Sequence, residues 1–176
     1  MRKKINLSDF SPASPHKYCC KSRNTKITIL YQMSRCTIFQ LTMEVLRSLR
    51  VLAMGAHSPE LYNNLGLCCL YAQQLDLIYP CFQRALELAI DPLVKAEIWY
   101  NLSYVALTAG DVQLAVQCLN VCLSADASHA SALNNLAVLY HKTGKTSLTK
   151  AYLTSATTVD PNLPEPQINL EILLND

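Results

Sequence analysis

The stretch 60-ELYNNLGLCCLYAQQLDLIYPCFQRALEL-88 decides the fold, because the same order of residue types returns twice more and then begins a fourth time. Within it lies an Asn-Leu pair that recurs along the chain at a nearly constant interval of about 34 residues, the first interval being slightly longer. Its four copies are Asn64-Leu65, Asn101-Leu102, Asn135-Leu136 and Asn169-Leu170. A period in this range is typical of a solenoid, in which each repeat is one supersecondary unit.

Each full copy also places small and large residues at fixed positions. A small residue follows the Asn-Leu pair, a large apolar one comes half a repeat after the Leu, and a second small residue follows three positions later. Where two helix axes approach to about 8–10 Å, small residues permit the contact and large ones fill the space beside it. We call these residues the packing set: Leu65, Gly66, Phe82 and Ala85; Leu102, Ser103, Leu119 and Cys122; Leu136, Ala137, Leu153 and Ala156.

One repeat is predicted to be a helical hairpin. Apolar residues in 60–71 and 96–108 fall mostly at intervals of three and four, which places them on one face of a helix. Gly110 and Gly144, one repeat apart, mark the turns between paired helices. Two short amphipathic helices cannot bury their apolar faces alone. The sequence therefore predicts an all-α solenoid of stacked helical hairpins.

Helix starts are predicted from capping residues. Ser58 before Pro59 fits an N-cap, and Asp91 and Ser128 are expected to cap the corresponding helices of the next two repeats. Pro80 would cost about 3 kcal/mol in a helix interior, so we expect that helix to begin late, near Asp76, or to kink.

Three regions follow from these signals. Residues 1–42 are predicted to be a basic, disordered arm. Residues 43–55 are predicted to form the last helix of a partial preceding repeat, with Gly55 in the C-cap place. Residues 58–176 are predicted to form three full repeats and the first helix of a fourth. In that fourth helix, Pro164 and Pro166 fit only a first turn. Residues 1–50 carry ten Lys and Arg against two acids, whereas residues 51–176 carry five against eleven.

The basic arm leaves several interpretations open. It lacks the apolar run of a secretory signal, and no amphipathic helix marks it as a mitochondrial transit peptide. Attraction to nucleic acid or to a membrane surface is open to any basic tail, although a solvated arm without such a partner is our expectation. Residues 27–41 are more apolar, but the run is too short to span a bilayer and Arg35 interrupts it.

The repeat pattern resembles the tetratricopeptide repeat family, whose helix-turn-helix units of about 34 residues stack into a right-handed superhelix. The packing set, the run WYNL at 99–102 and Asp160-Pro161 carry this resemblance over 59–174. The runs LYNNLGLCCLYAQQ, FQRALELA, WYNLSYVA and NNLAVLY are similar to the Bardet-Biedl syndrome proteins of this family. Gln73 stands where the repeat normally has Gly.

This closer resemblance implies a subunit of the BBSome, a multi-subunit coat that carries membrane proteins to and from cilia. It implies other BBSome subunits as partners, a place in the cytoplasm, at the cilium and at its basal body or centrosomal region, and membrane association only through the complex. Residues 1–43 do not share the resemblance, and the chain stops where the family continues, so we expect a partial chain.

No motif in the sequence predicts catalysis or a cofactor. The eight Cys lack the spacing of a zinc site, and Cys81, Cys118 and Cys122 fall at packing positions, where buried reduced thiols are expected. The four His are scattered, and phosphate-loop, Ser-elbow and HExxH motifs do not occur. We therefore expect no metal, no cofactor and no enzyme activity. The four repeated Asn are expected to bond a neighbouring backbone in the stack.

Function is instead expected on the concave surface, lined by the first helix of each hairpin. We call the residues predicted to face it the groove set; it contains no Lys or Arg, which disfavours a clamp for a partner's terminal carboxylate. Acidic and aromatic side chains suit a helix or a basic loop of another protein subunit. The groove set is Glu60, Asn63, Leu67, Glu97, Tyr100, Tyr104, Asn134, Val138 and His141.

Two other functions fit a repeat scaffold. One is a tetratricopeptide adaptor that works outside cilia, and the other is the repeat arm of a larger enzyme, as in repeat-bearing glycosyltransferases. The apolar residues Ile168, Leu170 and 172–174 of the final helix also predict that the isolated chain self-associates.

Overall fold

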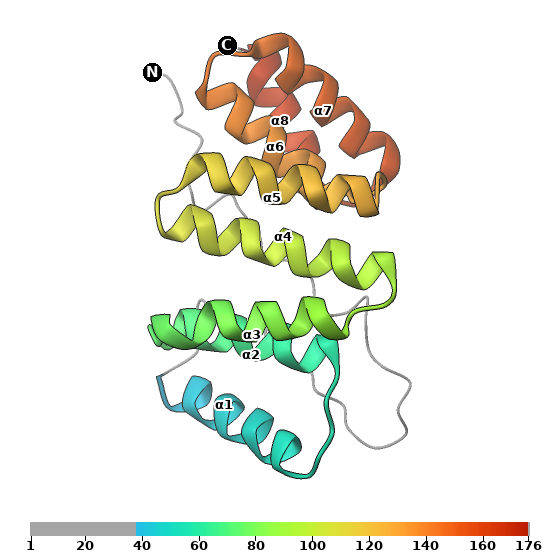
Figure 1. Cartoon of the computed structure of the whole chain (residues 1–176). Coiled ribbons are helices and arrows are strands. Elements are labelled where there is room, and N and C mark those ends of the chain that lie inside the picture. The colour runs from blue at the N-terminus through green and yellow to red at the C-terminus, as the bar shows by residue number, and fades with distance from the viewer. Residues whose placement is uncertain (1–37, 176) are drawn as a thin grey trace. The chain divides into compact units, whose positions relative to one another are not determined.

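The computed structural model describes residues 38–175, which form eight α-helices and no strand (Figure 1). The prediction of an all-α fold is therefore confirmed. The helices are α1 (Ile38–Ala53), α2 (Pro59–Tyr71), α3 (Leu75–Leu88), α4 (Pro92–Thr108), α5 (Val112–Ala125), α6 (Ala130–Lys142), α7 (Thr146–Val159) and α8 (Pro164–Asn175). The described residues fall into two compact units, which divide between Val94 and Lys95.

The unit up to Val94 contains α1, α2 and α3. Helices α2 and α3 form a hairpin, and α1 packs against α2. The two helices of the hairpin approach closely at Gly66, because a Cβ there would lie 2.8 Å from ring carbon Cε2 of Phe82. Glycine is thus the residue that lets the aromatic ring lie against the backbone of α2.

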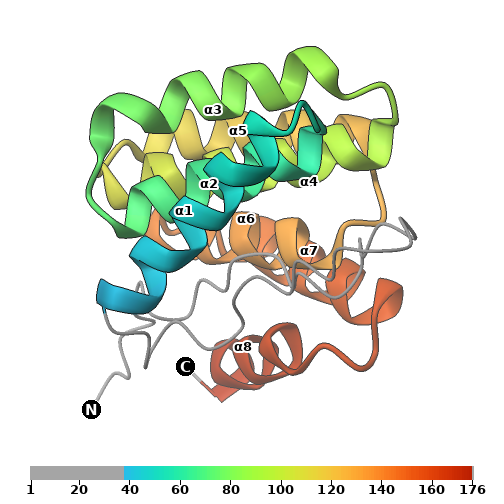
Figure 2. The ribbon, with the colours of Figure 1, turned by 90° about the horizontal axis from the view of Figure 1, so that it is seen from below.

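The unit from Lys95 onward contains most of α4 and all of α5 to α8. Helix α6 pairs with α7, and α8 contacts both of them (Figure 2). Helices α4 and α5 are joined by the turn at Gly110, whose φ is +82°. The second helix of one hairpin contacts the first helix of the next, as α5 does with α6 and α7 with α8. This alternation is the hairpin stacking that the repeat predicts.

All twelve residues of the packing set are buried in their units. Seven of them have no exposed surface: Ala85, Ser103, Leu119, Cys122, Leu136, Ala137 and Ala156. The described cysteines 68, 69, 81, 118 and 122 are buried and form no disulfide. Burial raises the pKa of the Cys81 thiol to about 12, with Cys69 beside it adding to the shift.

Two of the three predicted N-caps are confirmed. The Ser58 hydroxyl accepts a hydrogen bond from the Leu61 amide at 3.2 Å, and the Asp91 carboxylate accepts one from the Leu93 amide at 2.9 Å. The prediction of Ser128 as the cap of α6 is wrong. His129 caps this helix, because its Nδ1 accepts from the Ala132 amide at 3.2 Å.

Left-handed residues lie in the turns inside the hairpins and just after α1. Gly110 and Gly144, in hairpin turns, have φ values of +82° and +75°, and Gly55, after α1, has a φ of +80°. Gln73 takes the same conformation, with φ +57°, at the place where the α2/α3 turn would otherwise have glycine. A side chain is disfavoured in this region by about 1–2 kcal/mol, so this turn stores backbone strain.

Two helix boundaries refine the sequence prediction. Helix α1 begins at Ile38 rather than at Met43, so the end of the predicted arm, 38–42, belongs to that helix; residues 1–37 lie outside the described residues. Helix α3 begins at Leu75, late as expected, which leaves Pro80 an exposed place in its second turn.

Candidate functional site

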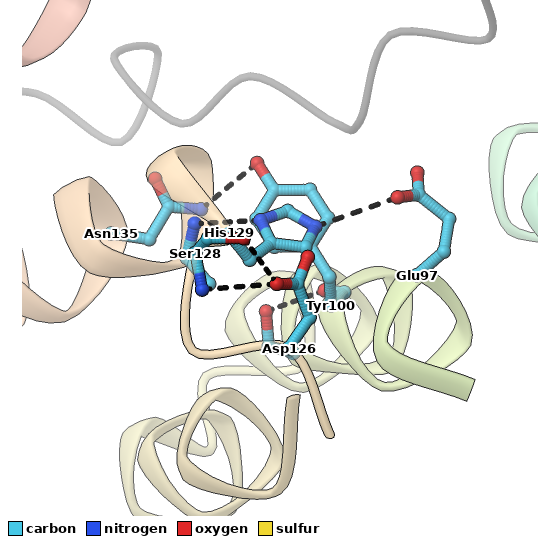
Figure 3. Close-up of polar contacts among 8 residues, drawn as sticks. Glu97, Tyr100, Asp126, Ser128, His129 and Asn135 are labelled. Atoms are coloured by element: carbon cyan, nitrogen blue, oxygen red, sulfur yellow. Dashed lines mark hydrogen bonds and ion pairs between the residues drawn. The ribbon is translucent and has the colours of Figure 1, made fainter. Parts of the chain in front are cut away.

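A buried polar cluster joins the first helices of two neighbouring hairpins, α4 and α6 (Figure 3). Tyr100 of α4 is 1% exposed, and the amide nitrogen of Asn135 donates a hydrogen bond to its hydroxyl at 3.3 Å. The ring of His129 stacks on the Tyr100 ring, with centroids 4.7 Å apart and planes inclined by 29°. Burial raises the pKa of the Tyr100 phenol, and the nearby Glu97 carboxylate raises it further.

His129 uses both ring nitrogens within this cluster. Nδ1 accepts from the Ala132 amide, and Nε2 lies 3.4 Å from a carboxylate oxygen of Glu97. A neutral ring with its proton on Nε2 satisfies both contacts. The His129 and Glu97 side chains are only 11% and 18% exposed. The pair superficially resembles a catalytic dyad, yet neither nitrogen is left to take a proton from a substrate.

The turn that presents His129 is held by its own hydrogen bonds. One oxygen of Asp126 accepts from the Ser128 amide at 3.0 Å and from the Ser128 hydroxyl at 2.6 Å (Figure 3). This explains why Ser128 does not cap α6: its hydroxyl points back to the preceding turn.

A second polar contact repeats the first one hairpin later. The Asn169 amide nitrogen donates to the Asn134 oxygen at 2.9 Å, and these residues are 35 apart in the chain, as Tyr100 and Asn135 are. In both contacts the donor is the Asn of an Asn-Leu pair. The acceptor belongs to the preceding repeat and lies one position before that repeat's own Asn-Leu pair. The expectation of a backbone partner is therefore wrong for Asn135 and Asn169, because each bonds a side chain.

The groove set divides by burial. In the unit from Lys95, Tyr100, Asn134 and Val138 are buried, whereas Glu97, Tyr104 and His141 are half-buried. In the other unit, Asn63 is buried, and Glu60 and Leu67 are half-buried. The buried members contribute to packing between helices in the chain, and binding of a partner by the groove set stays a prediction.

Sequence reasoning missed the part played by His129. Histidine is not among the favoured N-cap residues, and the preceding Ser128 offered a better match. The common spacing from Tyr100 to Asn135 and from Asn134 to Asn169 was a usable signal, because it equals one repeat plus one position.

Metal-binding clusters and membrane-spanning helices are both absent from 38–175. In this range, His, Cys, Asp and Glu side chains nowhere gather in groups of three that could hold a metal ion. The helices of the same range are all too short or too polar to cross a bilayer.

Comparisons with known proteins agree with this architecture. Residues 96–129 and 130–163 each match the family model for the tetratricopeptide repeat. Tetratricopeptide repeat protein 8 of Caenorhabditis elegans is 41% identical over 96 residues, which are 54% of this chain and 19% of that protein. The Homo sapiens protein of the same name is 45% identical over 86 residues, 49% of this chain and 16% of that protein. The chain thus spans less than a fifth of these relatives.

Three further proteins are more distantly similar. The photosystem I assembly protein Ycf3 of Rippkaea orientalis is 36% identical over 75 residues, 43% of this chain and 41% of that protein. The crystal structure of the APC/C hetero-tetramer Cut9-Hcn1 gives a TM-score of 0.63 at 22% identity, covering 77% of this chain and 28% of that chain. The crystal structure of YrrB, a TPR protein with an unusual peptide-binding site, gives a TM-score of 0.55 at 19% identity. The match covers 76% of this chain and 67% of that chain.

The fold, the packing set and the matched repeats lead to one conclusion. The helical hairpins bury a small and a large residue at each repeat, and two consecutive hairpins match the family model from residue 96 to residue 163. The chain therefore carries tetratricopeptide repeats and has the all-α tetratricopeptide-repeat fold.

Proposed function

We propose that this chain acts as a non-catalytic protein-interaction scaffold of the Tetratricopeptide repeat protein 8 kind, as a BBSome subunit in membrane-protein transport to cilia and in cilium assembly. The observation that carries the proposal is the 40–45% identity to three animal proteins of that name over about half of this chain. The chain would work in the cytoplasm, at the cilium and at the basal body or centrosomal region. It would reach membranes only through its complex.

The half-buried members of the groove set supply a contact surface within one unit. Glu97 and Tyr104 lie two helical turns apart on α4, so they share one face of that helix, and His141 lies on α6. The contacts of Tyr100 with His129 and Asn135 hold α4 and the start of α6 together. An acidic and aromatic surface of this kind suits a helix or a basic loop of another subunit.

The matched repeats support the non-catalytic part of the proposal, and the buried cluster is consistent with it. Its histidine is fully engaged by a helix amide and a carboxylate, and its phenol is buried against Asn135. These contacts stabilise the stack and leave no free base or nucleophile among them.

Affinity purification from ciliated cells tests the proposal. The tagged chain is expected to recover BBSome subunits, and Tyr104→Ala together with His141→Ala is expected to reduce that recovery. Tyr79→Ala is the matched control, because Tyr79 is an exposed aromatic residue on α3, outside the groove set. Recovery of no BBSome subunit by the parent chain, with its fold intact, would refute the ciliary assignment.

A second candidate is an assembly adaptor outside cilia. It is favoured by the 36% identity to Ycf3, which is named as a photosystem I assembly protein. The same purification separates the two, since this candidate predicts partners unrelated to cilia that still depend on Tyr104 and His141.

A further inference from the structure

The basic residues of the repeats gather in one hairpin. Residues 130–159, which form α6, α7 and the turn between them, contain three Lys and no Asp or Glu, a charge of +3. The remainder of 51–176 contains two Lys or Arg against eleven acids, a charge of −9. All three Lys of the hairpin are exposed: Lys142, Lys145 and Lys150. The α6/α7 hairpin is therefore a basic surface on an otherwise acidic set of repeats.

Lys145 lies at a position where a positive charge does not help the helix to form. It is the N-cap residue of α7, and its side chain makes no capping hydrogen bond. One repeat earlier, Asp111 is the N-cap residue of α5, and its carboxylate accepts a hydrogen bond from the Leu114 amide at 2.9 Å. The start of a helix is stabilised by a capping acceptor or an anion, and a cation there is unfavourable. Helix formation therefore does not account for the charge at Lys145.

Two tyrosines lie beside the Lys145 ammonium. Its Nζ is 5.3 Å from the centre of the Tyr140 ring, and this ring stacks on that of Tyr152, with centroids 5.5 Å apart and planes inclined by 24°. Both rings are half-buried where α6 and α7 meet. An ammonium has three N–H donors, and Lys145 is exposed, so it can bind a carboxylate while it stays over the ring. Lys142 has contacts of its own within the chain, and the site does not depend on it.

We propose that Lys145, together with the stacked rings of Tyr140 and Tyr152, binds an acidic segment of a partner protein. A carboxylate of the partner pairs with the ammonium, and the rings pack against the apolar stem of the same side chain. A membrane surface or a long nucleic acid is a poorer fit, because either would extend beyond one hairpin and meet the acids of the other repeats. None of the three residues belongs to the acidic groove set, so the proposal goes beyond the function proposed above.

Fluorescence anisotropy of a labelled hexaglutamate peptide at about 50 mM salt tests the contact, because a screening length of more than 10 Å at that salt preserves charge attraction. The parent chain is expected to bind the peptide. Lys145→Asp places like charges at the contact and is expected to weaken binding by about fivefold or more. Aspartate at this position can cap α7 as Asp111 caps α5, so the variant is expected to melt no lower than the parent. A loss of binding then does not result from unfolding.

Lys150→Asp is the matched control. It changes net charge as Lys145→Asp does, but Lys150 lies two positions from Tyr152 on α7, which places it on the opposite side of that helix. Binding of hexaglutamate is expected to stay within about twofold of the parent. A hexalysine peptide, which suits the acidic groove set instead, is expected to bind Lys145→Asp without loss. Failure of the groove and failure of this site can therefore be distinguished.

Three results with hexaglutamate would overturn the proposal: no binding to the parent, parental binding by Lys145→Asp, or equal weakening by Lys145→Asp and Lys150→Asp. Phosphatidylserine vesicles and a single-stranded oligonucleotide are tested in parallel. Tighter binding of either one, with a dependence on Lys145, would replace the protein segment by a membrane or a nucleic acid and would also overturn the proposal.

Discussion

The ring of Phe82 lies so close to Gly66 that a Cβ added to the glycine would stand 2.8 Å from Cε2 and 2.9 Å from Cδ2. The two other complete hairpins combine a larger first residue with a smaller partner, Ser103 with Leu119 and Ala137 with Leu153. The size of one residue is thus matched to the size of the other in each hairpin.

Gly66→Ala is expected to destabilise the α2/α3 hairpin. Overpacking of a buried site lowers the free energy of unfolding by about 1–3 kcal/mol, and the better helix propensity of alanine offsets up to about 1 kcal/mol of that loss. Urea unfolding of the variant would measure the net loss. Adding Phe82→Leu recreates the Ala137/Leu153 pair, so the double variant should be more stable than the sum of the two single changes predicts. Strict additivity would show that the two side chains do not compete for space.

Gln73→Gly is expected to stabilise the chain. Gln73 has a φ of +57°, which costs a residue with a side chain about 1–2 kcal/mol but costs glycine little. The gain should appear as a higher urea midpoint at unchanged slope. Gln74→Gly is the control, because Gln74 has a φ of −90° and gains nothing from glycine. Equal effects at both positions would remove the case for strain at Gln73.

The repeat made much of the fold predictable, and the exceptions have specific physical causes. Periodicity located the packing set because the two helices of every hairpin pack closely at the same position. Gly66, Ser103 and Ala137 occupy that position and are all buried. Periodicity also marked Gln73 as a departure at a glycine position. The start of α1 was missed because 38–42 was grouped with the basic arm rather than with the amphipathic run that begins at Met43.

The polar cluster was less predictable than the core. Its contacts join residues from different repeats, and each depends on one side chain that the repeat does not require. His129 could not be identified as a cap from its type, and its approach to Glu97 follows only once α4 and α6 are placed side by side. The burial of Tyr100 has the same origin, since its hydroxyl is covered by Asn135 of the following hairpin.

Tyr100→Phe is expected to lower stability by about 1–3 kcal/mol, because it removes the acceptor of the Asn135 amide in a buried site. Chemical unfolding monitored by circular dichroism would measure the loss. Tyr79→Phe deletes a hydroxyl from an exposed tyrosine and should be nearly neutral. If both changes proved neutral, the Tyr100 contact would contribute nothing to the α4/α6 interface.

The buried thiols predict a loss of stability at alkaline pH. Burial raises the pKa of Cys69, Cys81, Cys118 and Cys122, in the case of Cys81 from 9.0 to about 12. Above about pH 9 the unfolded thiols release protons that the folded ones keep, so the unfolded state binds fewer protons and the free energy of unfolding falls as pH rises towards 12. Burial of Tyr100 acts in the same direction above pH 10.

Urea unfolding in the presence of reductant, at neutral pH and at pH 10, would measure this loss. Cys81→Ala should reduce its dependence on pH, because one raised thiol is removed. Peptide-level mass spectrometry after iodoacetamide treatment provides a second readout, in which the buried cysteines should resist labelling until the chain unfolds. Rapid labelling of Cys81 in the native chain would contradict its burial.

His129→Ala is expected to cost about 1 kcal/mol or more, because it removes the acceptor for the Ala132 amide at the start of α6 and the ring that covers Tyr100. His129→Asn separates these two roles. Asparagine is among the best N-cap residues, so it should restore the cap without restoring the stacked ring or the contact with Glu97. Thermal melts should therefore rank the parent first, His129→Asn second and His129→Ala last. Should asparagine match alanine, capping would not be the reason that this turn holds a histidine; should it match the parent, the ring contacts would be dispensable.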